Sequence, residues 1–110
     1  MTQLNNSTTT ILNAADATGA GSTFNVPPLW RELANGLTWE VVITGSPTTV
    51  SASLQGSLDN SNWYDLDTHT NVGNNIHAVD APLPAYVRGY VATLSGGTTP
   101  TVTVKVMKGR

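Results

Sequence analysis

Cysteine is absent from this chain of 110 residues. Without cysteine the fold has neither disulfide bonds nor a thiolate metal site. No apolar stretch approaches the roughly 20 residues that a membrane-spanning helix needs. The first ten residues, MTQLNNSTTT, lack the basic and apolar regions of a secretory signal. We therefore expect a protein that is made in the cytoplasm and has no membrane partner.

Charge is also scarce. Charged residues make up 11% of the chain, and the net charge is −2. The sequence has no basic footprint of the kind that binds nucleic acid, so we expect no nucleic-acid partner. Three of the five basic residues, Lys105, Lys108 and Arg110, lie within the last six positions. This cluster is either a docking tail for an acidic partner or a solvated chain end.

Catalytic constellations are missing from the sequence as well. His69 and His77 are the only histidines, and sequence order alone indicates no Ser-His-Asp set. His77 lies in a short predicted strand, where a histidine is more often packed or hydrogen-bonded than a catalytic base. Gly96-Gly97 lies between two predicted strands, which indicates a hairpin turn rather than a phosphate-binding loop. We expect no enzymatic activity and no cofactor.

Four potential metal ligands do lie close together. Asp59, Asp65, Asp67 and His69 fall within eleven residues, and oxygen-rich loops can hold Ca²⁺. However, no Gly-centred calcium loop is present, and Asp65 and Asp67 flank Leu66 on a strand-like segment. The alternative is turn hydrogen bonding for Asp59 and solvated strand ends for the others, and we expect no metal site.

Alternating apolar and polar residues are what this sequence has in abundance. A period of two is typical of half-buried strands. Residues 50–67 predict two strands joined by a polar turn at 59–62, because short polar side chains bond their own backbone there. One face of the first strand is predicted to hold Val50, Ala52, Leu54 and Leu58, and the other Ser51, Ser53, Gln55 and Ser57.

Further strands are predicted along the rest of the chain. Only residues 29–35 could form a helical turn, and they are too few to be stable alone. Turns recur at the spacing of a sandwich or barrel. We predict an all-β fold, an antiparallel β-sandwich of the jelly-roll type with about eight strands and little or no helix. Residues 11–110 form a single domain in this prediction, after a polar N-terminal arm at 1–10. The remaining predicted strands are 9–14, 22–26, 37–44, 76–79, 85–94 and 101–107.

Aromatic residues are the candidates for contacts. Trp39 alternates with polar residues and is predicted to lie in the core, while Trp63 is predicted to cap one end of the sandwich. Tyr86, Arg88 and Tyr90 share the strand face opposite Val87 and Val91. This composition is that of an interface hot spot, or alternatively of an ordinary outer face.

Trp30 and Arg31 lie in the irregular segment before residue 37. They either form an exposed anchor or fold over a sheet edge. The candidate protein-interface residues are therefore Trp30, Arg31, Tyr86, Arg88, Tyr90, Lys108 and Arg110.

Two stretches carry a family resemblance. Residues 56–66, GSLDNSNWYDL, and residues 85–106, AYVRGYVATLSGGTTPTVTVKV, resemble a pattern common in small bacteriophage structural proteins. The resemblance extends over residues 37–107 and is most like a small capsid decoration, or cement, protein. It implies a protein that binds the outside of an assembled capsid and stabilises it.

The resemblance also implies partners. They are the major capsid protein and further copies of the chain, with a trimer favoured, on the exterior of a virion made in a bacterial host. The alternative is a carbohydrate- or host-surface-binding module of a phage tail or fibre. That alternative needs an aromatic platform such as Trp30 or Tyr64 beside Asp65 and Asn62.

Overall fold

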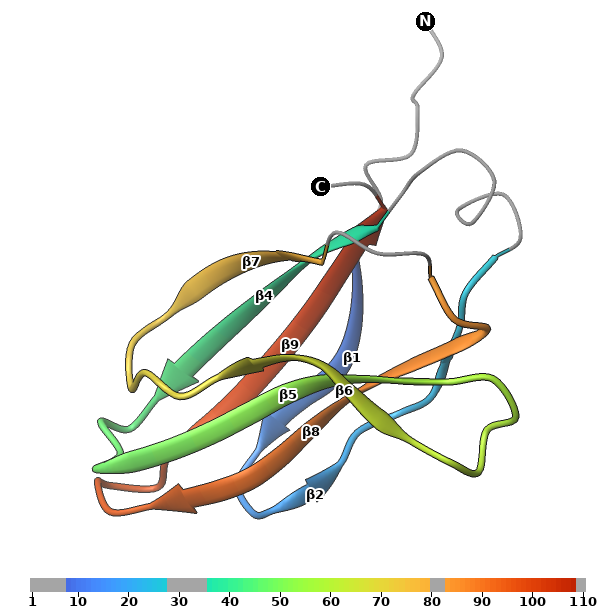
Figure 1. The fold of residues 1–110 in the computed structure, drawn as a ribbon. Coiled ribbons are helices and arrows are strands. Elements are labelled where there is room, and N and C mark those ends of the chain that lie inside the picture. The colour runs from blue at the N-terminus through green and yellow to red at the C-terminus, as the bar shows by residue number, and fades with distance from the viewer. Residues whose placement is uncertain (1–7, 28–35, 80–82, 109–110) are drawn as a thin grey trace, which may run out of the picture.

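The computed structural model describes residues 8–27, 36–79 and 83–108 (Figure 1). These residues form nine strands in two antiparallel sheets and contain no helix, and hence none that could cross a membrane. The all-β prediction is confirmed. The strands are β1 (Thr8–Ala15), β2 (Gly19–Ala20), β3 (Phe24–Asn25), β4 (Leu37–Thr44), β5 (Thr49–Ser57), β6 (Tyr64–His69), β7 (Asn75–Val79), β8 (Tyr86–Ser95) and β9 (Thr101–Lys108).

The two sheets make the jelly-roll sandwich that the turn spacing predicts. The first sheet has the order β1-β9-β4-β7, and the second has the order β2-β8-β5-β6, with β3 also pairing with β8. We call them sheet A and sheet B. Apart from the β5–β6 hairpin and the consecutive segments β2 and β3, each connection carries the chain from one sheet to the other. Because β2 and β3 both pair with β8, they occupy the place of one strand in an eight-stranded jelly roll.

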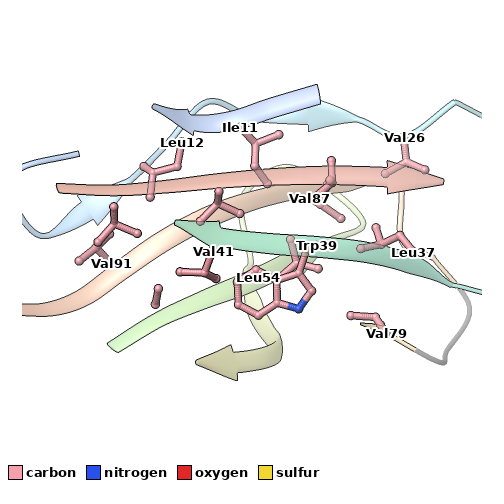
Figure 2. Packing of buried hydrophobic residues seen from close by; sticks show 14 of the residues in the cluster. Ile11, Leu12, Val26, Leu37, Trp39, Val41, Leu54, Val79, Val87 and Val91 are labelled. Atoms are coloured by element: carbon pink, nitrogen blue, oxygen red, sulfur yellow. The ribbon is translucent and has the colours of Figure 1, made fainter. Parts of the chain in front are cut away.

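The core lies between the sheets and follows the period of two. On β4, Leu37, Trp39 and Val41 are fully buried and alternate with half-buried residues. Figure 2 shows these side chains meeting those of β8 and β5, among them Val87 and Leu54. Each fully buried aliphatic side chain contributes about 1.5–3 kcal/mol. With so few charges in the chain, this apolar layer is the main source of stability. Val102, Val104 and Val106 of β9 are also buried, and the predicted core position of Trp39 on β4 is confirmed.

Residues 19–25 form two short segments, β2 and β3, rather than the single strand predicted at 22–26. The Gly21 N–H donates to Gly89 O of β8 at 2.8 Å, and the Ser22 N–H donates to Ile11 O of β1 at 2.9 Å. The chain thus bonds to both sheets, which interrupts the pairing with β8. A Cβ atom on Gly21 would lie only 2.1 Å from Ile11 O. This close approach therefore requires glycine.

The β5–β6 hairpin is confirmed, but Leu58 is not on its core face. Leu58 is 81% exposed. The Ser57 hydroxyl accepts hydrogen bonds from the Asp59 and Asn60 N–H groups at 3.2 and 2.9 Å, which ends β5 and begins the turn at Ser57. Leu58 therefore belongs to the turn, where the strand alternation no longer applies.

Gly96-Gly97 is a corner between the sheets, not the predicted hairpin. It links β8 of sheet B to β9 of sheet A. The corner packs against the corresponding β4–β5 corner, where Gly45 O accepts from the Thr98 N–H at 2.8 Å. A glycine pair does not distinguish a hairpin from a corner, because both turns need positive φ angles.

The predicted boundary at residue 10 falls inside a strand. Thr8, Thr9 and Thr10 belong to β1, where they pair with Met107, Val106 and Lys105 of β9. Threonine has good β propensity, and pairing with β1 covers the side of β9 that does not pair with β4. Residues 1–7 of the predicted arm lie outside the described residues, as does the predicted helical turn at 29–35.

Candidate functional site

The outer face of sheet B brings together aromatic and polar side chains from three strands. Strand β8 is buried on alternate residues, so that Val87, Gly89 and Val91 face the core. The intervening residues of β8 face outward, as the alternation predicts. We call this surface the Arg88 face and define it by Gln55, Trp63, Asp65, Tyr86, Arg88 and Tyr90.

A row of hydrogen bonds crosses this face. Gln55 of β5 lies opposite Asp65 of β6 on one side and opposite Arg88 of β8 on the other. Its Nε2 donates to Asp65 Oδ1 at 3.0 Å, and its Oε1 accepts from Arg88 Nε at 2.8 Å. The carboxylate accepts only, and the guanidinium donates only. The amide orientation is therefore fixed, and Gln55 in turn holds the guanidinium.

Two aromatic rings also contact the Arg88 guanidinium. Its guanidinium carbon lies 4.2 Å from the centre of the Trp63 ring and 5.7 Å from the centre of the Tyr90 ring. Stacking of this kind is favourable, because the ring face is electron-rich. Trp63 is half-buried beneath Arg88 on the outer face and is not the end cap that its position after the turn predicts.

The Arg88 guanidinium has hydrogen-bond donors that remain available for a partner. Only its Nε atom has a hydrogen-bond partner among the residues that the structure describes. The two terminal nitrogens can donate in parallel to a carboxylate or to carbonyl oxygens. The arrangement therefore presents a fixed cation, flanked by aromatic rings, on a flat sheet surface.

A pocket lies at the tip of the β5–β6 hairpin. It has a volume of about 310 Å³ and is lined by Gly56, Ser57, Leu58, Asp59, Asn62, Tyr64, Leu66 and Pro84. We call it the hairpin pocket. Tyr64, which lies opposite Gly56 in the hairpin, is 69% exposed. Large apolar groups thus meet solvent here, beside polar groups of the turn.

Asp59 organises the polar side of the hairpin pocket. Its Oδ1 accepts from the Ser61 and Asn62 N–H groups, each at 2.9 Å, and from the Ser57 hydroxyl at 3.0 Å. Its Oδ2 accepts from Asn62 Nδ2 at 2.8 Å. The backbone N–H groups of Asn62 and Ser61 hold the pKa of the Asp59 carboxyl far below its ordinary value, so the group is a carboxylate at neutral pH. The predicted turn role of Asp59 is confirmed.

A third group of polar residues joins the two sheets in the interior. We call Trp39, Asp67, His69 and His77 the inter-sheet polar cluster. The fully buried Trp39 of sheet A donates from Nε1 to Asp67 Oδ2 of sheet B at 2.9 Å. The Trp39 ring also stacks on His77, with 5.0 Å between ring centres. Asp67 is therefore not a solvated strand end.

The two histidines form a second contact between the sheets, since His77 lies on β7 and His69 on β6. His69 Nε2 lies 2.9 Å from Gly73 O, and His69 Nδ1 lies 2.9 Å from His77 Nε2. A carbonyl oxygen can only accept, so His69 carries its hydrogen on Nε2. In the neutral pair, His77 Nε2 then donates to His69 Nδ1. The prediction that His77 is packed and hydrogen-bonded is confirmed, and both histidines have structural partners.

Four of the seven predicted interface residues lie in the described part of the chain, and they belong to two different sheets. Tyr86, Arg88 and Tyr90 lie together on the outer face of sheet B. Lys108 is the last residue of β9 in the other sheet, where it lies opposite Leu37. Trp30, Arg31 and Arg110 lie outside the described residues.

Sequence reasoning missed the partners of Arg88 and the composition of the hairpin pocket. Gln55 and Asp65 face each other across the hairpin, and a symmetric pairing about the turn at 58–62 gives this register. No comparable local signal places β8 beside β5. The Arg88 contacts to Gln55 and Trp63 therefore depend on the order of strands in the sheet.

Comparison with known proteins adds evidence on the fold. No protein-family model matches this chain, and no curated protein matches it either. One similar solved structure is the crystal structure of SPBc2 prophage-derived protein YomS. The TM-score is 0.66 at 19% sequence identity, over 96% of this chain and 95% of that chain. At this identity the similarity shows the fold alone, which the two proteins share over nearly their whole lengths.

Proposed function

We propose that this chain is a structural protein of a bacteriophage virion that binds the outer surface of an assembled capsid and stabilises it. The jelly-roll fold supports the proposal, as does the similarity of that fold to a prophage-derived protein. The resemblance of residues 56–66 and 85–106 to phage decoration proteins supports it as well. The proposed role needs no catalytic group or cofactor.

The observation that carries the proposal is the fixed guanidinium of Arg88. Gln55 and Trp63 hold it before any partner arrives. Binding therefore orders few additional rotamers, and this lowers the entropic cost of association. Arginine, tyrosine and tryptophan are also the residue types that dominate interface energetics. A carboxylate or a pair of carbonyl oxygens of the major capsid protein is the matching acceptor.

Stabilisation of the shell follows from selective binding. A ligand that binds assembled subunits but not separated ones shifts the equilibrium toward assembly. A homo-oligomer of this chain, with a trimer favoured, engages several capsid subunits at once and gains avidity without new contacts. The protein then sits on the exterior of the virion after its synthesis in the host cytoplasm.

Arg88→Ala tests the contact surface directly. Loss of a hot-spot arginine costs about 2 kcal/mol, which is roughly a 30-fold rise in Kd for particles that lack the protein. Arg88→Lys keeps the charge but loses the planar stacking and the fork of donors, so its Kd should lie between those of the wild type and Arg88→Ala. Co-sedimentation of purified protein with such particles measures the Kd. Heating the decorated particles then gives the temperature at which they release their genome.

Lys105→Ala is the matched control. Lys105 is half-buried on β9 of sheet A, opposite Glu40, and its loss removes the same charge from the other sheet. We expect wild-type binding for this variant. Equal binding by Arg88→Ala and Lys105→Ala would exclude the Arg88 face. Equal release temperatures for naked and decorated particles would exclude the stabilising role.

A second candidate function is binding of the host surface from a phage tail or fibre. The hairpin pocket favours it, because Tyr64 lies there beside Asp59 and Asn62. The distribution of the protein over the particle separates the two candidates. Regular spacing over the head supports capsid binding, whereas labelling confined to the tail supports host-surface binding.

A further inference from the structure

The hairpin pocket combines a firm floor with an exposed aromatic wall. A Cβ atom on Gly56 would lie 2.6 Å from Pro84 Cγ and 2.9 Å from Leu66 Cδ1. Glycine at this position therefore lets Pro84 and Leu66 close the bottom of the pocket. The volume of about 310 Å³ is at the lower end of the range for small-molecule sites.

The exposed wall suits the apolar face of a small ring. Tyr64 begins β6 and is 69% exposed, and Leu58 on the turn is 81% exposed. A tyrosine offers a broad apolar ring with a hydrogen-bonding tip. The C–H bonds on one face of a pyranose ring pack against such a surface, and its hydroxyls remain free for polar groups at the rim.

The polar rim presents mainly hydrogen-bond acceptors. Asp59 Oδ2 accepts one hydrogen bond, from Asn62 Nδ2, and has a further lone pair. Because the Asn62 amide donates to this carboxylate, its carbonyl oxygen points elsewhere, and it has no partner within the described part of the chain. Asn62 Nδ2 retains one hydrogen as a donor. Sugar hydroxyls both donate and accept, so they can satisfy all of these groups, whereas an apolar side chain from a protein partner cannot.

The charge of the pocket selects among saccharides. Turn N–H groups keep Asp59 ionised, and the residues that line the pocket include no lysine, arginine or histidine. An acidic sugar would place its carboxylate near that of Asp59 without a compensating cation. A neutral sugar meets no such repulsion.

We propose that the hairpin pocket binds a neutral saccharide, with Tyr64 as the stacking surface and with Asp59 and Asn62 as hydrogen-bond partners of its hydroxyls. This inference deepens the second candidate function and is independent of capsid binding through the Arg88 face. The two surfaces use different residues, so each can fail without the other.

Titration of the ¹⁵N-labelled full chain by NMR tests the proposal. The probes are the methyl glycosides of glucose, galactose, mannose and N-acetylglucosamine, with methyl glucuronide as the acidic counterpart of methyl glucoside. We expect at least one neutral glycoside to shift amide signals within residues 56–66 and at Pro84's neighbours, and methyl glucuronide to shift none of them. Tyr64→Ala should weaken the binding about tenfold.

Ile76→Ala is the matched control, because Ile76 is also a large exposed side chain on an edge strand, 62% exposed on β7. It should leave saccharide affinity unchanged. The proposal is overturned if no neutral glycoside shifts these signals, if methyl glucuronide binds equally well, or if Tyr64→Ala binds as tightly as the wild type. Shifts produced by an apolar peptide but by no glycoside would also overturn it, in favour of a protein ligand.

Discussion

Replacement of Asp67 by alanine should destabilise the fold through a residue of the opposite sheet. Trp39 is fully buried, and its Nε1–H has Asp67 Oδ2 as partner at 2.9 Å. An unsatisfied buried donor costs about 1–3 kcal/mol. The Thr68 N–H, which donates to Asp67 Oδ1, is on an exposed residue and can bond to water instead. The expected loss is therefore about 2 kcal/mol.

Urea unfolding followed by circular dichroism measures this loss. In thermal unfolding, the same loss of about 2 kcal/mol lowers the Tm of a domain of this size by roughly 8 °C. Asp67→Asn keeps an acceptor oxygen and should lose about half as much, because the bond to Trp39 is no longer charge-assisted. Hydrogen exchange at the Trp39 indole should accelerate in Asp67→Ala and much less in Asp67→Asn.

Asp65→Ala is the control on the same strand. Asp65 is exposed and bonds to the half-buried Gln55, so its removal should cost under about 0.5 kcal/mol. If Asp65→Ala and Asp67→Ala unfold at the same urea concentration, the bond between Trp39 and Asp67 does not join the sheets energetically. Equal losses in Asp67→Asn and Asp67→Ala would contradict the hydrogen-bond explanation in favour of an effect of the Asp67 charge, because asparagine keeps both the volume and an acceptor oxygen.

Two further predictions concern turns. The folded-state pKa of Asp59 is lowered, so its carboxylate contributes stability in full above the unfolded-state pKa of about 3.9 and loses it as the pH falls toward the lower folded value. The difference in stability between wild type and Asp59→Asn should therefore be largest at neutral pH and shrink in acid, as pH-dependent urea unfolding will show; a constant difference would refute this. Gly45→Ala should cost at least about 2 kcal/mol, because φ is +84° and the new Cβ would lie 2.5 Å from Pro100 Cα, whereas Gly73→Ala in an exposed loop with ordinary φ should change stability little. Similar midpoints for the two glycine variants would show that the corner between β4 and β5 tolerates a side chain.

The alternation of residue types was sufficient to predict most of the fold. Strand β4 has the predicted bounds, and Trp39 lies in the core as its period of two requires. The alternation does not predict β2 and β3 as separate short segments, because their shape depends on hydrogen bonds to β1 and β8 rather than on local sequence. Leu58 was misplaced because Ser57 ends the strand through side-chain bonds that alternation does not include.

The candidate surfaces were predictable only in part. The stripe of Tyr86, Arg88 and Tyr90 follows from strand periodicity alone. Its organisation by Gln55 and Trp63 follows from the position of β5 between β6 and β8, which is a property of the whole sheet. The buried partner of Asp67 was not foreseeable either, because Trp39 belongs to the other sheet and lies 28 residues away in sequence.

Binding of this protein to the capsid exterior through the Arg88 face can be seen in a reconstruction of the virion by electron cryomicroscopy, with and without the protein. We expect regularly spaced density of jelly-roll shape on the outside of the capsid, with the outer face of sheet B against the shell and the Arg88 guanidinium beside an acceptor of the capsid protein. Density confined to the tail, or a capsid-bound molecule whose Arg88 face points to solvent, would contradict it.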